Sequence, residues 1–277
     1  MEMQMSSNLS KIDLCIIGKP NSGKSTLFNK LLKKYISNVG SQYGLTQNLI
    51  KDQFEFKNHL FTLYDTPGLR RKNKIYDTNE EKRNKEVTKL IKNVEFVILL
   101  IDVIENITKQ DFRLADLVLK SQKSIFLVFN KIDLLDDQLK FKKQTQQFLE
   151  KNYSKYLTIN LDFISAKNDT KILSVLNKIL KNKKLINSKL SKPDLKNFLN
   201  TLDKKNKYPK IKNIEIRPKY IVQINKQILY FKVFINSKNK APKLFCRFLE
   251  NSFRNHFKLK GVPIVFDFIS SKNPFAN

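Results

Sequence analysis

An eight-residue stretch near the amino terminus has the residue types and spacing of a phosphate-binding loop. Its pattern is GxxxxGKS, formed by Gly18, Lys19, Pro20, Asn21, Ser22, Gly23, Lys24 and Ser25. An apolar run at 12–17 predicts a buried strand before the loop, and leucines at helical spacing in 26–34 predict a helix after it. Backbone N–H groups at a helix N-terminus attract phosphates. We expect Lys24 to reach the β- and γ-phosphates and the Ser25 hydroxyl to bind Mg²⁺.

Two further segments have the chemistry of the phosphate end of a nucleotide site. Asp65, Thr66, Pro67 and Gly68 form a DxxG pattern directly after a predicted strand. We expect Asp65 to hold Mg²⁺ through water, and the Gly68 N–H to contact the γ-phosphate. Thr46 is the expected switch threonine on Mg²⁺. It lies in the polar loop 36–50, which, like 66–79, lacks clean periodicity, as nucleotide-dependent switch loops do.

Two more motifs have the chemistry of a guanine pocket. Asn130, Lys131, Ile132 and Asp133 form NKxD after another predicted strand. The Asp133 carboxylate can accept two hydrogen bonds from the guanine edge, which adenine cannot donate, while Lys131 packs over the base. Ser165, Ala166 and Lys167 follow a further strand and complete the pocket through backbone N–H groups. Because all four motifs follow predicted strands, they converge on one sheet edge and predict GTP binding.

Strands and helices alternate over residues 11–182, which predicts an α/β domain with a mostly parallel sheet. The expected strands are 12–17, 60–65, 95–102, 124–130 and 158–164, with 51–57 as an antiparallel edge strand. The expected helices are 25–34, 79–92, 109–120, 138–152 and 170–181. We interpret residues 1–10 as a disordered lead or linker, 11–182 as a G domain (a P-loop GTPase domain) and 183–191 as a linker.

Residues 192–277 predict a small α+β domain of order α-β-β-α-β. The expected elements are 193–204, 219–224, 228–235, 242–257 and 262–269. Phe245, Phe248 and Phe253 share one face of the second helix, so we interpret them as core residues rather than base-stacking platforms.

The chain is strongly basic, with a net charge of +28. Residues 183–277 carry 22 basic and 5 acidic residues, whereas 1–182 carry 31 and 20. A bias toward AT-rich codons explains the excess of Lys over Arg but not this concentration. We therefore expect an anionic partner, RNA or an RNA–protein surface, near the last third of the chain.

Several features of the whole sequence indicate the cellular compartment of the protein. Cys15 and Cys246 lie in predicted apolar elements, which indicates packed thiols in a reducing cytoplasm. Residues 1–10 do not have the pattern of a signal peptide, and the longest apolar run, 96–101, is too short to span a membrane. We expect a cytoplasmic, monomeric protein without membrane or DNA partners.

Taken together, the sequence resembles the translation-factor-like GTPases of Ras-type fold, and most closely the Der (EngA) ribosome-biogenesis GTPases. The likeness is to their second G domain plus the C-terminal KH-like domain. The segments that carry it are 65–72, 101–102, 108–111, 219–223, 234–236, 247–254, 261–264 and 273–275.

Three departures from the family stand out. This sequence holds one G domain where the family has two. Gln47 and Asn48 follow Thr46 where the family usually has Arg and Asp, and DTPG replaces the usual DTAG.

A separate comparison concerns RNA-binding KH domains, which clamp nucleotides with a GxxG loop. The KH-like segment lacks this loop, since Gly261 is the sole glycine after Gly68.

Leu69 follows the DxxG glycine, where a glutamine orients the attacking water in Ras-like enzymes. Because leucine cannot do so, we expect slow intrinsic hydrolysis. Asn21 is the candidate for a K⁺ site that supplies the missing charge, as in related GTPases. The alternative is that Asn21 only stabilises the loop turn.

The resemblance implies a GTP-binding and GTP-hydrolysing assembly factor for the large ribosomal subunit, with GTP, GDP and rRNA as partners. Two alternatives remain open. One is an Era-type small-subunit factor, although such a factor would need the missing GxxG loop. The other is a ribosome-associated nucleotide-binding module with negligible turnover.

Overall fold

The computed structural model describes residues 9–35, 51–64, 80–152, 158–204, 208, 210–211, 214–224, 228–237 and 239–270. The chain divides into two compact units, residues 1–177 and 178–277. Each unit has its own hydrophobic core, and we describe each by itself.

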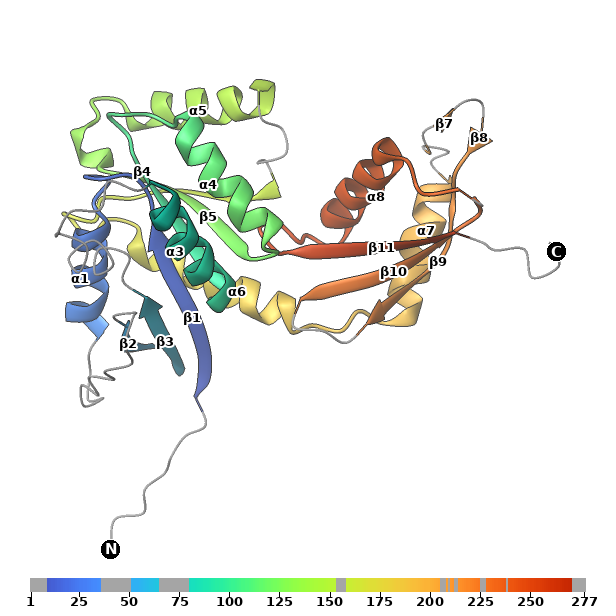
Figure 1. Cartoon of the computed structure of the whole chain (residues 1–277), viewed down its shortest axis with the longest axis horizontal. Coiled ribbons are helices and arrows are strands. Elements are labelled where there is room, and N and C mark those ends of the chain that lie inside the picture. The colour runs from blue at the N-terminus through green and yellow to red at the C-terminus, as the bar shows by residue number, and fades with distance from the viewer. Residues whose placement is uncertain are drawn as a thin grey trace, which may run out of the picture. The chain divides into compact units, whose positions relative to one another are not determined.

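The first unit is built on a six-stranded sheet of order β2-β3-β1-β4-β5-β6 (Figure 1). β2 runs antiparallel to β3, and the remaining neighbours are parallel, as the sequence predicts. The central strands β4 and β5 are buried along their whole length, as expected of near-continuous apolar runs in a sheet covered on both faces. The strands are β1 (Ser10–Ile17), β2 (Lys51–Phe56), β3 (His59–Tyr64), β4 (Phe96–Asp102), β5 (Ser124–Asn130) and β6 (Asn160–Phe163).

Helices cover both faces of this sheet. One core packs α3, α4 and α5 against the face that includes Cys15, Val97 and Leu127. On the other face, Leu27 of α1 and Val175 of α6 meet Ile98. The helices are α1 (Lys24–Tyr35), α3 (Glu80–Asn93), α4 (Lys109–Lys120), α5 (Gln138–Asn152) and α6 (Ile172–Ile186), with a short 3-10 helix, η1 (Ile132–Leu134). This layering brings the ends of β1, β4 and β5 to one edge of the sheet, where the loops that follow them meet.

The second unit contains a three-stranded sheet of order β11-β10-β9, with β10 antiparallel to β9 and parallel to β11. The predicted order α-β-β-α-β is present, and the structure adds a two-residue pair, β7 and β8, that is too short for sequence periodicity to indicate. The elements are α7 (Lys192–Lys204), β7 (Lys210–Ile211), β8 (Ile214–Glu215), β9 (Pro218–Ile224), β10 (Leu229–Ile235), α8 (Lys243–His256) and β11 (Ile264–Ser270).

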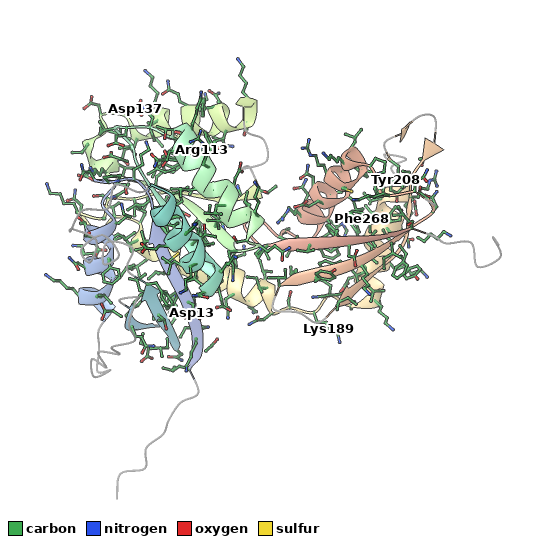
Figure 2. The ribbon with its side chains drawn as sticks, in the orientation of Figure 1. Asp13, Arg113, Asp137, Lys189, Tyr208 and Phe268 are labelled. Atoms are coloured by element: carbon green, nitrogen blue, oxygen red, sulfur yellow. The ribbon has the colours of Figure 1, made fainter. Side chains whose placement is uncertain are left out.

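Aromatic side chains form the core of this second unit. Phe245 and Phe253 of α8 are fully buried, which confirms their predicted core role, and Phe248 is partly buried against the same cluster. Figure 2 labels Phe268 of β11, whose ring meets Phe245 edge-on at 5.9 Å between centroids. The amphipathic pattern of α8 therefore builds the core and leaves the opposite side of the helix to solvent.

The last helix of the predicted G domain is longer than expected. The sequence predicts its end at 181, but α6 continues to Ile186. Leu185 and Ile186 pack against the core of the second unit, and the Asn182 amide donates to the Gly261 carbonyl at 3.0 Å. Part of the expected linker 183–191 is therefore helical, because these contacts favour continued helix over a free connector.

The segment after α6 is also tied to the second unit. The Gln223 side chain accepts from the Leu190 N–H at 2.7 Å and donates to the Ser188 carbonyl at 3.0 Å. One amide therefore satisfies two backbone groups of this connector.

The two cysteines are free. Cys15 is fully buried in β1, and this burial raises the pKa of its thiol well above the ordinary value. A thiol in this state is inert packing material, as expected. None of the helices in the described part of the chain is long and apolar enough to cross a membrane.

Candidate functional site

The phosphate-binding loop connects the end of β1 to the start of α1 through unusual backbone angles. Gly18, Asn21 and Gly23 have φ values of 145°, 61° and 94°. A Cβ at Gly18 would lie 2.3 Å from the Leu100 carbonyl oxygen, so only glycine fits there. Asn21 is exposed, and asparagine is among the non-glycine residues that best tolerate this left-handed conformation.

Two side chains of the loop, those of Ser22 and Lys24, are buried. Lys24 is 6% exposed, and its Nζ donates to the Lys19 carbonyl within the loop. The Ser22 hydroxyl donates to the same carbonyl at 3.1 Å. The ammonium group of Lys24 therefore lies at the helix N-terminus, where it adds to the positive end of the helix dipole.

Asn130 joins the phosphate loop to the 165–171 loop. Its Nδ2 donates to the Ser22 carbonyl at 2.9 Å, and its Oδ1 accepts from the Ala166 N–H at 2.9 Å. Asn130 is 2% exposed. A Cβ at Gly23 would lie 2.2 Å from Asn130 Nδ2, so Gly23 leaves the room for this contact.

Asp133 offers an acceptor to a ligand. Its Oδ1 is a buried atom that receives no hydrogen bond from any residue that the structure describes. Asp133 lies in η1, whose first N–H, on Ile132, donates to the Ile164 carbonyl at 3.2 Å. A buried carboxylate oxygen without a donor is costly, and N–H groups of a guanine edge would satisfy it.

The 165–171 loop closes the same region. Ser165 is 1% exposed, and its Oγ accepts from the Asn168 N–H at 3.1 Å. The Ser165 and Thr170 backbones bridge each other, while the Lys167 side chain is exposed. The loop is therefore held by its own hydrogen bonds and by Asn130.

Sequence reasoning missed the acidic residues that hold two lysines of these motifs. Asp102 ends β4, and its carboxylate accepts from Lys131 Nζ at 2.6 Å and from the Ile104 N–H at 3.0 Å. Parallel register pairs Asp102 with Asn130, which brings Lys131 within reach. Asp102 is 6% exposed, so this ion pair is partly shielded from water.

Asp111 forms a similar ion pair with Lys19. It is 1% exposed, and its Oδ2 lies 3.3 Å from Lys19 Nζ. The same oxygen accepts from the N–H and the hydroxyl of Thr108, a capping arrangement at the start of α4. Glu105 lies 3.6 Å from the same ammonium group. The Lys19 side chain is thus held by carboxylates, while its backbone carbonyl accepts hydrogen bonds from Ser22 and Lys24 of the phosphate loop.

Two signals in the sequence point to these acids. Asp102 is an acidic residue at the end of an apolar run, and Thr108 with Asp111 has the spacing of a capping box. Their lysine partners lie 29 residues after Asp102 and 92 before Asp111 in the chain. Local patterns do not identify partners at such separations.

Some predicted site residues lie outside the described residues. They are Thr46, Asp65, Thr66, Pro67, Gly68 and Leu69. Of the expected Mg²⁺ ligands, Ser25 is described, and it is exposed at the start of α1. Among the residues that the structure describes, no three His, Cys, Asp or Glu side chains cluster in a way that could hold a metal ion.

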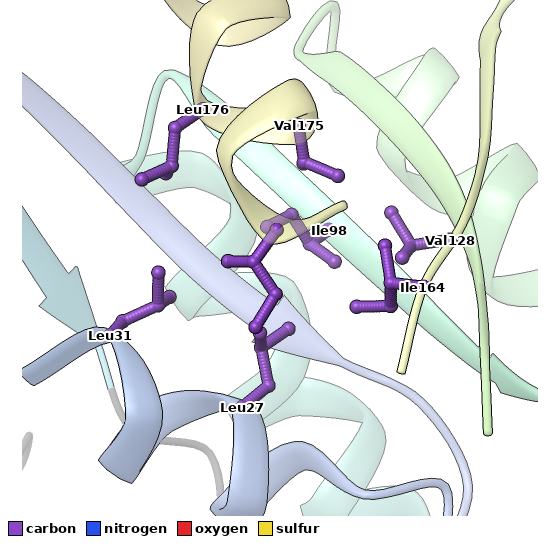
Figure 3. Close-up of a pocket in the computed structure, with 8 residues that line it drawn as sticks. Leu27, Leu31, Ile98, Val128, Ile164, Val175 and Leu176 are labelled. Carbon is purple, nitrogen blue, oxygen red and sulfur yellow. The ribbon is translucent and has the colours of Figure 1, made fainter. Parts of the chain in front are cut away.

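A small cavity lies beneath α1 and α6 (Figure 3). Its lining is wholly apolar, so it offers no partner to a phosphate or a base. It is a packing gap of the core, distinct from the motif-bearing edge of the sheet. The residues that line it are Leu27, Leu31, Ile98, Val128, Ile164, Ile172, Val175 and Leu176.

The sheet order, the glycine-rich loop and the Asn130 bridge together define the first unit as a Ras-like P-loop GTPase domain. Residues 13–131 match the family model described as "50S ribosome-binding GTPase". Residues 189–268 match the model "KH-domain-like of EngA bacterial GTPase enzymes, C-terminal". The chain therefore joins a domain that matches a GTPase family model to a domain that matches the C-terminal KH-like domain of the EngA GTPases.

The chain is also similar to named proteins. The chain is 32% identical over 268 residues to GTPase Der of Rickettsia prowazekii and to GTPase Der of Rickettsia bellii. These matches cover 96% of this chain, which spans about 60% of the length of those relatives. Among solved structures, a point variant of Era from Aquifex aeolicus bound to GDP·AlF4⁻ is 17% identical, with a TM-score of 0.48, over 95% of this chain and 93% of that chain.

The orphaned Asp133 oxygen predicts a change of nucleotide preference in the Asp133→Asn variant. An amide offers one acceptor and one donor group, so it cannot accept two guanine N–H groups but can donate to the 2-oxo group of xanthine. We expect GDP affinity to fall by about 10²-fold or more and XDP affinity to rise. Titrations with fluorescent GDP and XDP measure both, with the exposed Asp136→Asn as the matched control. An unchanged preference for GDP over XDP in Asp133→Asn would contradict this assignment.

The Asp102–Lys131 ion pair predicts weaker nucleotide binding without loss of base selectivity in Asp102→Asn. Without a charged partner, Lys131 must be ordered when the base binds. Because ordering a lysine costs up to about 2 kcal/mol, we expect GDP affinity to fall by about tenfold. The ratio of GDP to XDP affinities should stay at the wild-type value, because Asp133 is intact. A GDP affinity equal to that of wild type would show that the pair does not position Lys131.

Proposed function

We propose that this protein binds and hydrolyses GTP and acts in the assembly of the large ribosomal subunit. The observation that carries the nucleotide part is the buried, unpaired Asp133 oxygen, which lies three residues after the asparagine that reaches the phosphate loop. The family model named for 50S ribosome binding supports the partner, as do the relatives named GTPase Der.

In this proposal each motif contacts a different part of the nucleotide. Lys24 neutralises the β- and γ-phosphates, and the backbone N–H groups of the loop, which every residue except Pro20 has, surround them. Asp133 reads the guanine edge, while Lys131 lies over the base and Ala166 and Lys167 complete the pocket. Mg²⁺ would be held by the Ser25 hydroxyl together with Thr46 and Asp65, and would neutralise charge on the phosphates.

Hydrolysis is proposed to be slow unless K⁺ is present. Leu69 has no group that could orient water, so the transition state lacks an essential contact. Asn21 is a proposed K⁺ ligand because its side chain is exposed on the phosphate loop, and its backbone has a left-handed conformation. Asn21→Gly preserves that backbone and removes the side chain, so it separates the two roles proposed for this residue.

The second unit is proposed to connect nucleotide state to ribosome binding. Its excess of basic residues suits an rRNA surface, and the switch loops 36–50 and 66–79 would present a different surface with GTP than with GDP. We place this action in the cytoplasm, with the protein as a monomer.

The K⁺ proposal predicts cation-dependent GTP hydrolysis. At equal ionic strength and saturating Mg²⁺, we expect K⁺ to raise single-turnover hydrolysis by about 10-fold or more over Na⁺, because a well-placed cation can replace an arginine finger. Asn21→Ala and Asn21→Gly should both lose the difference between the salts while keeping GDP binding. If Asn21→Gly keeps the stimulation, or if wild type has equal rates in both salts, K⁺ does not act through Asn21.

The partner proposal predicts nucleotide-dependent co-sedimentation with ribosomal subunits. We expect binding to separated large subunits with a non-hydrolysable GTP analogue, weaker binding with GDP, and a decrease as salt rises. Preference for small subunits would favour the Era-type alternative. Ribosome binding without any single-turnover hydrolysis would favour a non-enzymatic module.

A further inference from the structure

Positive charge lines α8 and the turn that follows it. Lys243 and Arg247 of the helix are exposed, as are Lys258 and Lys260 of the turn. Glu250 is the only acidic residue between Asn239 and Val262 in the sequence. We call the exposed row formed by Lys243, Arg247, Asn251, Lys258 and Lys260 the α8 crest.

The crest lies opposite the side of α8 that builds the core. Phe245, Leu249 and Phe253 are buried at intervals of four residues. Lys243, Arg247 and Asn251 follow one another at the same interval on the exposed side. A helix rises about 1.5 Å per residue, so neighbours in this row are about 6 Å apart along the axis. The three helical residues of the row therefore form a continuous ridge.

The single carboxylate on α8 does not neutralise this ridge. Glu250 accepts from Arg254 Nη2 at 2.8 Å and Nε at 3.0 Å, and Nη1 of the same arginine donates to the Val262 carbonyl at 2.6 Å. Arg254 and Glu250 thus engage each other and the turn. The charges of Lys243, Arg247, Lys258 and Lys260 remain uncompensated by any acidic residue of the same segment.

Several other surfaces of the unit are of mixed sign. On α7, Lys192 and Lys196 flank Asp194, and Lys204 follows Asp203. On the sheet, Lys232 of β10 lies beside Asp267 of β11 in the parallel register. Glu215 and Arg217 pair at 2.6 Å. The part of α6 in this unit also carries only basic residues, Lys178, Lys181, Lys183 and Lys184. Within the described part of the unit, α8 is therefore one of two helices with an excess of positive charge.

We propose that the α8 crest binds the phosphate backbone of structured ribosomal RNA. This inference rests on the proposed function and names the surface through which the second unit would act. Lysine and arginine neutralise phosphates and release counterions, and the Asn251 amide can donate to a phosphate or a 2′-hydroxyl. A ridge of this kind recognises charge and shape rather than sequence.

Stacking on single-stranded bases does not suit this surface. Phe245 and Phe253 are buried, and the Phe248 ring lies against Tyr208 at 6.0 Å between centroids (Tyr208 is labelled in Figure 2). The crest therefore offers no aromatic face for a base to stack on. Backbone contacts to a folded RNA are the mode that its chemistry supports.

The test compares two double variants with equal loss of charge. Lys243→Gln with Arg247→Gln removes two crest cations, and Lys192→Gln with Lys196→Gln removes two cations from α7. Each lost phosphate contact lowers the slope of log K against log salt by about 0.9, so the crest variant should bind large subunits about tenfold or more weakly at 0.1 M salt. The α7 variant should lose less than about twofold.

Two controls keep the result interpretable. Thermal midpoints and GDP affinity should match wild type in both variants, because neither pair touches the core or the nucleotide site. Binding is also measured to protein-free large-subunit rRNA and to vesicles of anionic lipid. Equal losses in the two variants, no loss in the crest variant, or crest-dependent binding to vesicles but not to RNA would each overturn the proposal.

The controls also separate this proposal from the proposed function. If wild type ignores ribosomal subunits but binds the protein-free rRNA through the crest, the proposed function fails and the RNA surface stands. If wild type binds subunits and the crest variant binds equally well, the RNA surface fails and the proposed function stands.

Discussion

The Asn130 side chain is the interaction on which the geometry of the candidate site depends. With one amide it fixes the carbonyl of Ser22 in the phosphate loop and the N–H of Ala166 in the 165–171 loop. These loops lie more than a hundred residues apart in the chain, yet they must form one pocket. Gly23 makes the bridge possible, because any side chain there would collide with the amide. The bridge is buried, so water does not compete for it.

Around this bridge, two lysine side chains of the site are held in place by aspartates. Lys19 is held by Asp111, in the first turn of α4, and Lys131 is held by Asp102, the last residue of β4. Ordering these side chains before a nucleotide arrives lowers the entropy lost on binding. Both aspartates lie outside the four nucleotide motifs, but they hold lysines that belong to two of those motifs. In the second unit, α8 likewise combines two tasks, since one side completes an aromatic core and the other displays basic residues.

Most elements of the fold were predictable from periodicity, because each strand or helix carries its own apolar pattern. The errors have identifiable causes. The end of α6 was misplaced because Leu185 and Ile186 pack on residues far along the chain. The β7–β8 pair escaped notice because two-residue strands have no period. Asp102 and Asp111 were unassigned because their lysine partners are distant in sequence.

The sequence by itself determined the motifs, their order, the layered α/β class and the basic second unit. Each of these depends on local residue types and spacing. Only the tertiary structure decided which side chains meet: that Asn130 bridges two loops, that Asp133 keeps an unpaired buried oxygen, and that the carboxylate of α8 is engaged by Arg254. The physical reason is that hydrogen bonds and burial depend on distances in space, which parallel strand register and helix packing set between residues far apart in the chain.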